Sequence, residues 1–242
     1  RAELDSKMTQ ADFEGELYRK LFKLITEHEA ELQAAKPKVT KNSAGYYLWN
    51  VWDGQTFNLC KLIVGSQGTL GIVAEITFRL VPVKPISKLL VIFLKDLAPV
   101  ARLVNELLPL KPESLESYDD NTIKLALRFW WGIMKAIKVQ HFFRLIVGFI
   151  PEVFLIIRGG WPKLVVIAEF SGDDEQKVDQ SLTEASKRVA GLGLLHRVTK
   201  TDEEEAGYWT IRRESFNLLR HHVKGKRTAP FIDDIIVRPE FL

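Results

Sequence analysis

Apolar residues recur with helical spacing over residues 10–35 of the chain. The positions at three- and four-residue intervals are Phe13, Leu17, Leu21, Leu24 and Ile25. Asp12 stands where a helix N-terminus favours negative charge, and Pro37 pushes the residue before it away from helical backbone angles. The pattern therefore predicts one amphipathic helix that ends just before Pro37.

A different periodicity follows at residues 71–81, where every second residue is apolar. The apolar positions are Ile72, Ala74, Ile76, Phe78 and Leu80. Strict alternation is typical of a strand with one buried face. Because Pro82 and Pro85 close the run, we expect a half-buried strand here and a domain boundary near residue 85.

Beyond this boundary the spacing of apolar residues switches repeatedly between that of strands and that of helices. The predicted strands are 89–94, 114–118, 163–170, 194–198 and 232–237, and the predicted helices are 98–108, 173–190 and 203–222. The order is β-α-β, an interruption, and β-α-β again. This order favours an α+β layer in which helices cover one face of an antiparallel sheet.

The interruption, residues 129–157, is rich in aromatic and basic side chains. Lys135, Lys138 and Arg144 break its apolar stretches before they reach the roughly 20 residues of a membrane-spanning helix. Cationic residues among large aromatics suit a helix that lies in a membrane interface. A helical hairpin inside a core or a subunit interface is the alternative, and the pattern leaves both open.

Composition narrows the class of protein. Lys and Arg number 34 against 31 Asp and Glu, and this small excess gives little support to a nucleic-acid partner. Cys60 is the only cysteine, so the chain has no internal disulfide, and its Cys and His spacing predicts no metal site. These features favour a cytoplasmic location. The start at Arg1, without Met or signal peptide, leads us to expect a piece of a longer polypeptide.

Three glycines, Gly65, Gly68 and Gly71, recur at intervals of three residues. A residue without a Cβ lets backbone N–H groups approach a phosphate or a flavin ring closely. The same spacing also occurs in a tight turn or a β-bulge at the start of a strand. Taken alone, the glycines leave both interpretations open.

The complete run around these glycines is longer and more specific. It reads Gly65, Ser66, Gln67, Gly68, Thr69, Leu70, Gly71 and Ile72. It resembles the second half of the FAD-binding domain of the vanillyl-alcohol-oxidase and p-cresol-methylhydroxylase type. The segment from Lys41 through Gly45 to Tyr46 is similar to the Lys/Arg-x-x-x-Gly-Tyr segment that this family places shortly before the run. The resemblance implies FAD as cofactor along these residues, held by backbone contacts that survive Gln67 in place of the common Glu.

The resemblance extends over most of the chain. Residues 1–85 resemble the C-terminal part of the FAD-binding domain, and 86–242 resemble part of the substrate domain of FAD-linked oxidases, a ferredoxin-like antiparallel sheet in the α+β class with the helical insert 129–157. The family's other phosphate loop, and the histidine-rich catalytic or metal motif of its relatives, are expected outside the chain. No catalytic residue and no metal ligand are therefore assigned.

The implied activity is that of the D-lactate and glycolate dehydrogenase group. A 2-hydroxy acid would pass a hydride to flavin N5, and electrons would then reach a quinone or another carrier. Arginine pairs best with a substrate carboxylate, and the family's Trp-x-x-Arg segment points to Arg212, or to Arg213 if the register differs by one. Both arginines bonding carboxylates on neighbouring elements is the alternative.

Two hypotheses from other classes stand beside the enzyme. The first is a nonenzymatic fragment or subunit that keeps the fold and binds no flavin. The second is a membrane-binding module in which residues 129–157 contact the inner face of the membrane. A peripheral membrane enzyme would combine this contact with quinone reduction.

Overall fold

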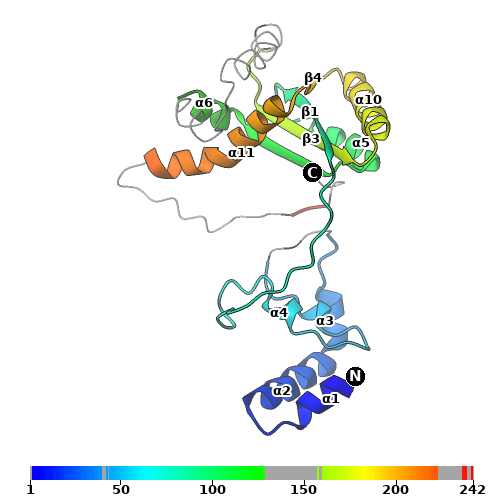
Figure 1. Ribbon diagram of the computed structural model, residues 1–242, viewed down its shortest axis with the longest axis vertical. Helices are drawn as coiled ribbons and strands as arrows, with labels where there is room; N and C mark the ends of the chain where they lie inside the picture. Colours follow the sequence, from blue (N-terminus) through cyan, green and yellow to red (C-terminus); the bar gives the residue numbers. More distant parts are fainter. Residues whose placement is uncertain are drawn as a thin grey trace. The chain divides into compact units, whose positions relative to one another are not determined.

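The computed structural model describes residues 2–39, 42, 44–128, 157, 160–222, 236–238 and 241, and side chains are described except at 215–222. The chain divides into two compact units, which we call the N-terminal unit (Arg1–Leu80 with Ile232–Arg238) and the C-terminal unit (Val81–Phe231 with Pro239–Leu242) (Figure 1). Most of the predicted insert and of the predicted strand 232–237 lies outside the described residues.

The N-terminal unit is built from short helices. They are α1 (Ala2–Thr9), α2 (Phe13–Glu27), α3 (Glu29–Ala35), the 3-10 turn η1 (Leu48–Asn50) and α4 (Cys60–Ile63). Asp12 caps α2 by accepting a hydrogen bond from the N–H of Gly15 at 2.9 Å. A Cβ on Gly15 would lie 2.1 Å from the Gln10 carbonyl oxygen, so only glycine permits this close turn into the helix.

The single helix expected over residues 10–35 is interrupted. His28 leaves helical backbone angles at φ −111° and ψ 18°, and it separates α2 from α3. The break is one residue long, and the helical spacing of apolar residues continues on either side of it, so the sequence pattern did not reveal it. The predicted end before Pro37 is confirmed, because α3 ends at Ala35.

The core of the N-terminal unit is small. Its buried residues are Ile25, Val51 and Leu62. Phe22 stacks edge-on against Trp52 and Phe57, with ring centroids 5.3 and 5.5 Å apart. Such pairs prefer tilted or edge-to-face geometry because of the ring quadrupole. Aromatic contacts therefore supplement the few aliphatic residues of this core.

The strand predicted at residues 71–81 is not formed in the described structure. Residues 71–84 have no regular secondary structure, and Ile72 and Leu80 are 99% and 86% exposed. A strand needs a neighbouring strand to pair its N–H and C=O groups. No described residue provides that pairing, so the alternating apolar side chains stay in solvent.

The C-terminal unit contains a four-stranded antiparallel sheet of order β2-β3-β1-β4. The strands are β1 (Ile86–Leu94), β2 (Ser114–Asp119), β3 (Leu164–Gly172) and β4 (Leu195–Val198). They confirm four of the five predicted strands. The order is that of the split β-α-β, ferredoxin-like arrangement, so the expected α+β class is confirmed for this unit.

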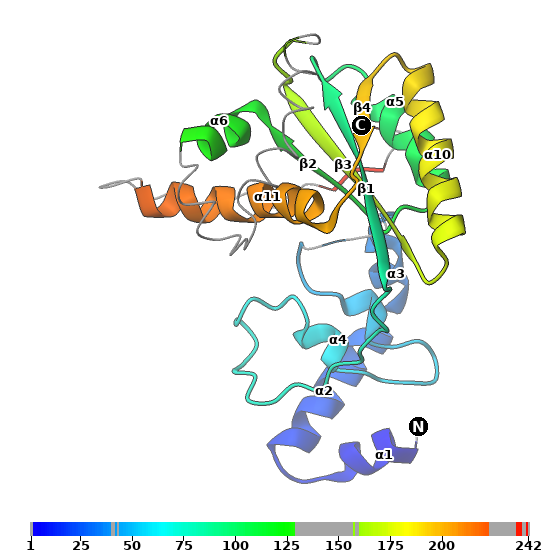
Figure 2. The ribbon, with the colours of Figure 1, turned by 45° about the horizontal axis from the view of Figure 1, so that its top comes forward.

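Helices cover both faces of this sheet, whereas one covered face was expected (Figure 2). On one face lie α5 (Val100–Leu107), followed by the 3-10 turn η2 (Leu108–Leu110), and α10 (Glu175–Gly191). On the other lie α6 (Asp120–Arg128) and α11 (Asp202–His222). The reason is in the strands themselves: consecutive residues Leu89 to Leu94 of β1 are all buried, and a strand that is apolar on both faces needs cover on both.

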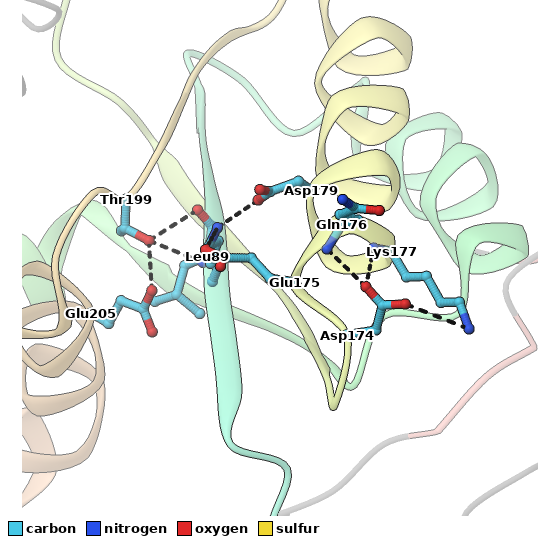
Figure 3. A network of polar contacts seen from close by, with 9 residues as sticks. Leu89, Asp174, Glu175, Gln176, Lys177, Asp179, Thr199 and Glu205 are labelled. Carbon is cyan, nitrogen blue, oxygen red and sulfur yellow. Dashed lines mark hydrogen bonds and ion pairs between the residues drawn. The ribbon is translucent and has the colours of Figure 1, made fainter.

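Charged contacts attach α10 to the sheet (Figure 3). Lys88 of β1 pairs with Glu175 at 3.0 Å and with Asp179 at 2.6 Å, and its hydrogen bonds to Asp179 and Glu175 raise the pKa of the Lys88 ammonium. Asp174 caps the helix by accepting from the N–H groups of Gln176 and Lys177. Among the described helices, none is long and apolar enough to cross a membrane.

Candidate functional site

The glycine run forms an exposed turn directly after α4. Gly65, Gln67 and Gly68 have φ of 82°, 53° and 78°, the left-handed region that glycine adopts at little cost. Gln67 adopts it although it carries a side chain. Ser66 is the buried residue of the turn. The backbone conformation, more than any charged side chain, thus defines this segment.

Tyr46 joins the two segments that resemble the FAD-binding domain. Its hydroxyl lies 2.8 Å from Thr69 Oγ1, across 23 residues of sequence. Thr69 Oγ1 itself donates to the Ser66 carbonyl oxygen at 2.6 Å. A threonine hydroxyl has one hydrogen, so Tyr46 is the donor in the first bond. Gly45, with φ of 71°, turns the chain immediately before this tyrosine.

The turn fits a phosphate- or flavin-binding segment. A Cβ placed on Gly68 or Gly71 would meet nothing within 4 Å, so the backbone there is open to a ligand. Within the described residues, the N–H groups of these two glycines donate to no other group. Successive unpaired N–H groups in a turn attract anions such as a pyrophosphate. The bond between Tyr46 and Thr69 thus places the turn at Gly45 beside the run from Gly65 to Ile72, whose backbone is open to an anionic ligand.

The second candidate region is the face of the sheet under α11. Tyr208 is fully buried there, and Trp209 and Ile211 pack against the same cluster as Val91 and Ile167. Residues three and four apart share one side of a helix. Arg212 follows Tyr208 by four residues and therefore turns toward the sheet.

Arg212 donates through Nη2 to the carboxylate of Glu116 on β2. Arg213 is exposed and makes no ion pair within the part of the chain that the structure describes. The two arginines thus differ in surroundings: Arg212 is oriented by a neighbouring strand, as in the structural alternative raised by the sequence, and Arg213 extends into solvent. Both side chains are accessible, and both belong to the C-terminal unit, whereas the glycine turn belongs to the N-terminal unit.

The first turn of α11 is attached to the sheet by buried polar contacts. Arg197 of β4 pairs with Glu204, and these side chains are only 10% and 12% exposed. Thr199 donates to Glu205 Oε1 at 3.0 Å and accepts from the Leu89 N–H at 3.0 Å (Figure 3). These contacts fix the start of the helix that carries Arg212.

Glu205 has an unusual proton affinity. Burial raises the pKa of its carboxyl to about 7, with a further rise from the charges of Asp202 and Glu169, against opposing hydrogen bonds from Thr199 and Ser87. A carboxyl with this pKa is part protonated at neutral pH and can accept or release a proton there. The sequence offered no sign of it, because Glu169 is brought to Glu205 only by the sheet.

Metal ligation has no support in the described part of the chain, where no three His, Cys, Asp or Glu side chains gather around a position for an ion. The Asp120 carboxylate, although buried, is committed to Lys124 at 2.7 Å and to Lys163 at 3.4 Å. Its pKa is held low, first by the hydrogen bond from Lys124. This cluster ties the start of α6 to the start of β3 and is structural.

Comparison with known proteins finds dehydrogenases that are similar to this chain. D-2-hydroxyglutarate dehydrogenases from Pseudomonas putida, Pantoea ananatis and Escherichia coli are 27%, 24% and 21% identical to this chain. The matches cover 94 to 95% of the chain but 22% of each relative. The chain thus spans about a fifth of the length of the curated relatives it matches.

A family model described as FAD linked oxidases, C-terminal domain, matches residues 85–242. This range contains the whole ferredoxin-like sheet and the helices on both its faces. The cofactor of that family is FAD, in agreement with the expectation from the glycine run, and its members are oxidoreductases. More than half of the sequence lies in the match, and the chain therefore belongs to the family of FAD linked oxidases.

Proposed function

We propose that this chain is part of an FAD-dependent dehydrogenase that oxidises a D-2-hydroxy acid. The observation that carries the proposal is the bond between Tyr46 and Thr69, which joins the two halves of the flavin motif in a chain of this family. Residues 1–85 then form the C-terminal part of the FAD-binding domain. Residues 86–242 form part of the substrate domain, with the insert 129–157.

The cofactor is held by backbone groups in this proposal. The open N–H groups of Gly68 and Gly71 contact the pyrophosphate or the edge of the flavin, and Gly45 positions Tyr46 against the turn. Gly65, Ser66 and Thr69 set the backbone conformation, and Leu70 and Ile72 provide apolar contacts beside the ring. Bound FAD supplies the acceptor, at N5, for the hydride that leaves the hydroxyl-bearing carbon of the substrate.

Arg212 is the proposed partner of the substrate carboxylate. Its guanidinium is planar and carries five N–H donors, a geometry that matches a carboxylate bidentately, and its bond through Nη2 to Glu116 orients it beside β2. Arg213 is the second candidate. The names of the relatives support D-2-hydroxyglutarate as the first substrate to test, with D-lactate and glycolate as smaller alternatives that lack the second carboxylate.

The test is an absorbance spectrum of the full-length protein that carries this chain, recorded before and after anaerobic addition of each acid. A flavin spectrum that bleaches with D-2-hydroxyglutarate, D-lactate or glycolate supports the activity and ranks the three substrates. A protein that stays colourless after FAD is supplied would sink the enzymatic proposal and favour a subunit that only retains the fold.

The role of Arg212 is tested by a matched pair of variants. Arg212→Lys keeps the charge but loses the planar donor set, so KM should rise by about 10- to 100-fold, the equivalent of one charged hydrogen bond. Arg213→Lys, one residue along the same helix, should change KM by no more than about twofold. The opposite ranking would assign the substrate contact to Arg213.

The electron acceptor in this proposal is a quinone or another carrier, reached through a membrane contact of residues 129–157. The support is the basic and aromatic composition of that segment. Sedimentation with anionic liposomes, with and without the segment, tests the contact. Equal sedimentation of both forms would remove the membrane from the proposal and leave a carrier in solution.

A further inference from the structure

The Glu116 side chain extends from β2 toward α11. Its backbone lies in register with Ile167 of β3, and alternation along the strand places Glu116 on the same face as Tyr118. Ile167 and Tyr118 belong to the buried apolar cluster that also contains Tyr208 of α11. The Glu116 carboxylate is therefore attached to a paired strand and lies beside the helix that carries Arg212.

Arg212 is the partner of this carboxylate. Its Nη2 donates to Glu116 Oε2 across 96 residues of sequence. The neighbouring polar group on the same face of β2, Ser114, donates instead to Glu169 at 2.9 Å. Among the described residues, Arg212 is the only group that bonds the Glu116 side chain. Glu116 is thus available to act on Arg212.

The ion pair does more for the orientation of Arg212 than for stability. The Arg212 and Glu116 side chains are 39% and 34% exposed, and an ion pair in such contact with water adds little to the free energy of unfolding. An arginine side chain has many rotamers, yet its planar guanidinium binds a carboxylate bidentately in only a few orientations. An acceptor fixed on a strand restricts the guanidinium before any ligand arrives.

We propose that Glu116 is a positioning residue, which holds the Arg212 guanidinium in the orientation that receives the substrate carboxylate. A side chain that is already ordered in the free protein loses less freedom on binding. Glu116 acts through Arg212 and does not itself contact the substrate. The role in substrate binding rests on the function proposed above, whereas the restraint on Arg212 does not.

The charge and the hydrogen bond of Glu116 have opposite effects on an anionic substrate. The negative charge weakens the attraction of Arg212 for a carboxylate, and the hydrogen bond keeps the guanidinium in place. Gln at position 116 keeps an acceptor oxygen without the charge, whereas Ala removes both. Comparison of Glu116→Gln with Glu116→Ala therefore separates positioning from charge.

The restraint on Arg212 is measured without a substrate, by the rate at which phenylglyoxal modifies arginines of the full-length protein. Peptide mass spectrometry distinguishes Arg212 from Arg213, which is exposed and serves as internal control. Glu116→Ala should raise the rate at Arg212 by about three- to fivefold, the equivalent of one exposed ion pair, and leave Arg213 unchanged. Equal Arg212 rates in wild type and Glu116→Ala would overturn the restraint.

The positioning role is measured by steady-state kinetics with D-2-hydroxyglutarate. Glu116→Ala should raise KM by about three- to tenfold, the equivalent of ordering one long side chain. Its kcat should change by no more than about twofold, because a contact made equally in ground state and transition state alters KM only. Glu116→Gln should keep KM within about twofold of wild type, because the acceptor oxygen is retained. Equal KM values in the two variants would overturn the positioning role.

Glu113→Ala is the matched control. Glu113 directly precedes β2 and pairs with Lys84, so this variant also removes a half-exposed ion pair at the same strand. Its KM should stay within about twofold of wild type, and a rise equal to that of Glu116→Ala would overturn a specific role of Glu116. If the wild type oxidises no hydroxy acid, the function proposed above fails, while the phenylglyoxal rates still decide whether Glu116 restrains Arg212.

Discussion

β1 and the segment of residues 71–83 both carry many apolar side chains, and their surroundings differ completely. Leu90 and Ile92 of β1 are fully buried between two helices and two neighbouring strands. Ile72 and Val83 of the segment are 99% and 92% exposed. The apolar content of the two is similar, but β1 has pairing partners on both edges within the described chain and the segment has none.

The difference shows what a strand-forming pattern requires. Burial of apolar surface stabilises a strand only when another layer excludes water from it, and backbone pairing needs a second strand. The C-terminal unit supplies both from its own sequence. In the N-terminal unit, the hydrogen bond between Tyr46 and Thr69 holds the glycine turn, and the core is small.

The largest effect should separate the two regions directly. Changing Ile167, which is fully buried at the centre of β3, to Ala should lower the free energy of unfolding by about 2 to 5 kcal/mol. Ile72→Ala, the same substitution at an exposed position, should change it by about 0.5 kcal/mol or less. Chemical denaturation of both variants measures this. Similar losses would mean that residues 71–83 are covered by another part of the protein.

The next effect is the pH dependence that Glu205 gives to the stability of the C-terminal unit. The folded pKa of Glu205 is about 7 against an ordinary value of 4.5, so between these two pH values the folded state holds a proton that the unfolded state has lost. Unfolding free energy should therefore fall as pH rises from about 4.5 to about 7, and level off above, by roughly 1 to 3 kcal/mol after allowing for partial exposure. Glu205→Gln should remove this slope in denaturation measured across pH. A slope that persists would assign it to other groups.

A smaller effect compares glycines from the two regions. Gly68→Ala forces a side chain into the left-handed region and should cost about 1 to 2 kcal/mol, with a lower flavin content in the purified protein. Gly191→Ala at the end of α10 also has open space around it but no positive φ, and should be neutral or stabilising by up to about 1 kcal/mol. Thermal unfolding and flavin absorbance of both variants provide the check. An Ala tolerated equally at Gly68 would argue against a backbone role there.

The smallest effect tests the bond that holds the glycine turn. Tyr46→Phe removes the hydroxyl that donates to Thr69 and should cost about 1 kcal/mol, with a weaker affinity for FAD. Tyr47→Phe is the control, because the Tyr47 hydroxyl bonds no other group within the described residues. Titration of apoprotein with FAD measures the difference. Equal affinity of both variants for FAD would show that the Tyr46 hydroxyl does not hold the turn in its FAD-binding conformation.

Local patterns predicted most of the C-terminal unit. The strands predicted at 89–94 and 114–118 appear with ends no more than three residues from the predicted ones, because their apolar runs are bounded by prolines and charged turns. The helix predicted over residues 173–190 appears as α10, which begins two residues later because Asp174 caps it. The break at His28 was missed, since a single nonhelical residue does not disturb the apolar rhythm.

Some residues of the candidate sites could be found from the sequence, and others only from the structure. The run from Gly65 to Ile72 and the residues Gly45 and Arg212 were found from sequence, because motif spacing records local backbone needs. The different surroundings of Arg212 and Arg213 depend on which side of α11 meets the sheet. Glu116, Glu169 and Glu205 carried no signal, since acidic residues are common on any surface.

By itself, the sequence determined the succession of helices and strands in the described part of the C-terminal unit, the glycine turn and the family of FAD linked oxidases, because these depend on neighbours along the chain. Tertiary structure alone decided that Tyr46 reaches Thr69, and that the Glu205 carboxyl is buried where α11 meets the sheet. Packing brings groups from distant positions together and removes water from them. That loss of water gives an ordinary glutamate an altered proton affinity, which no local pattern can encode.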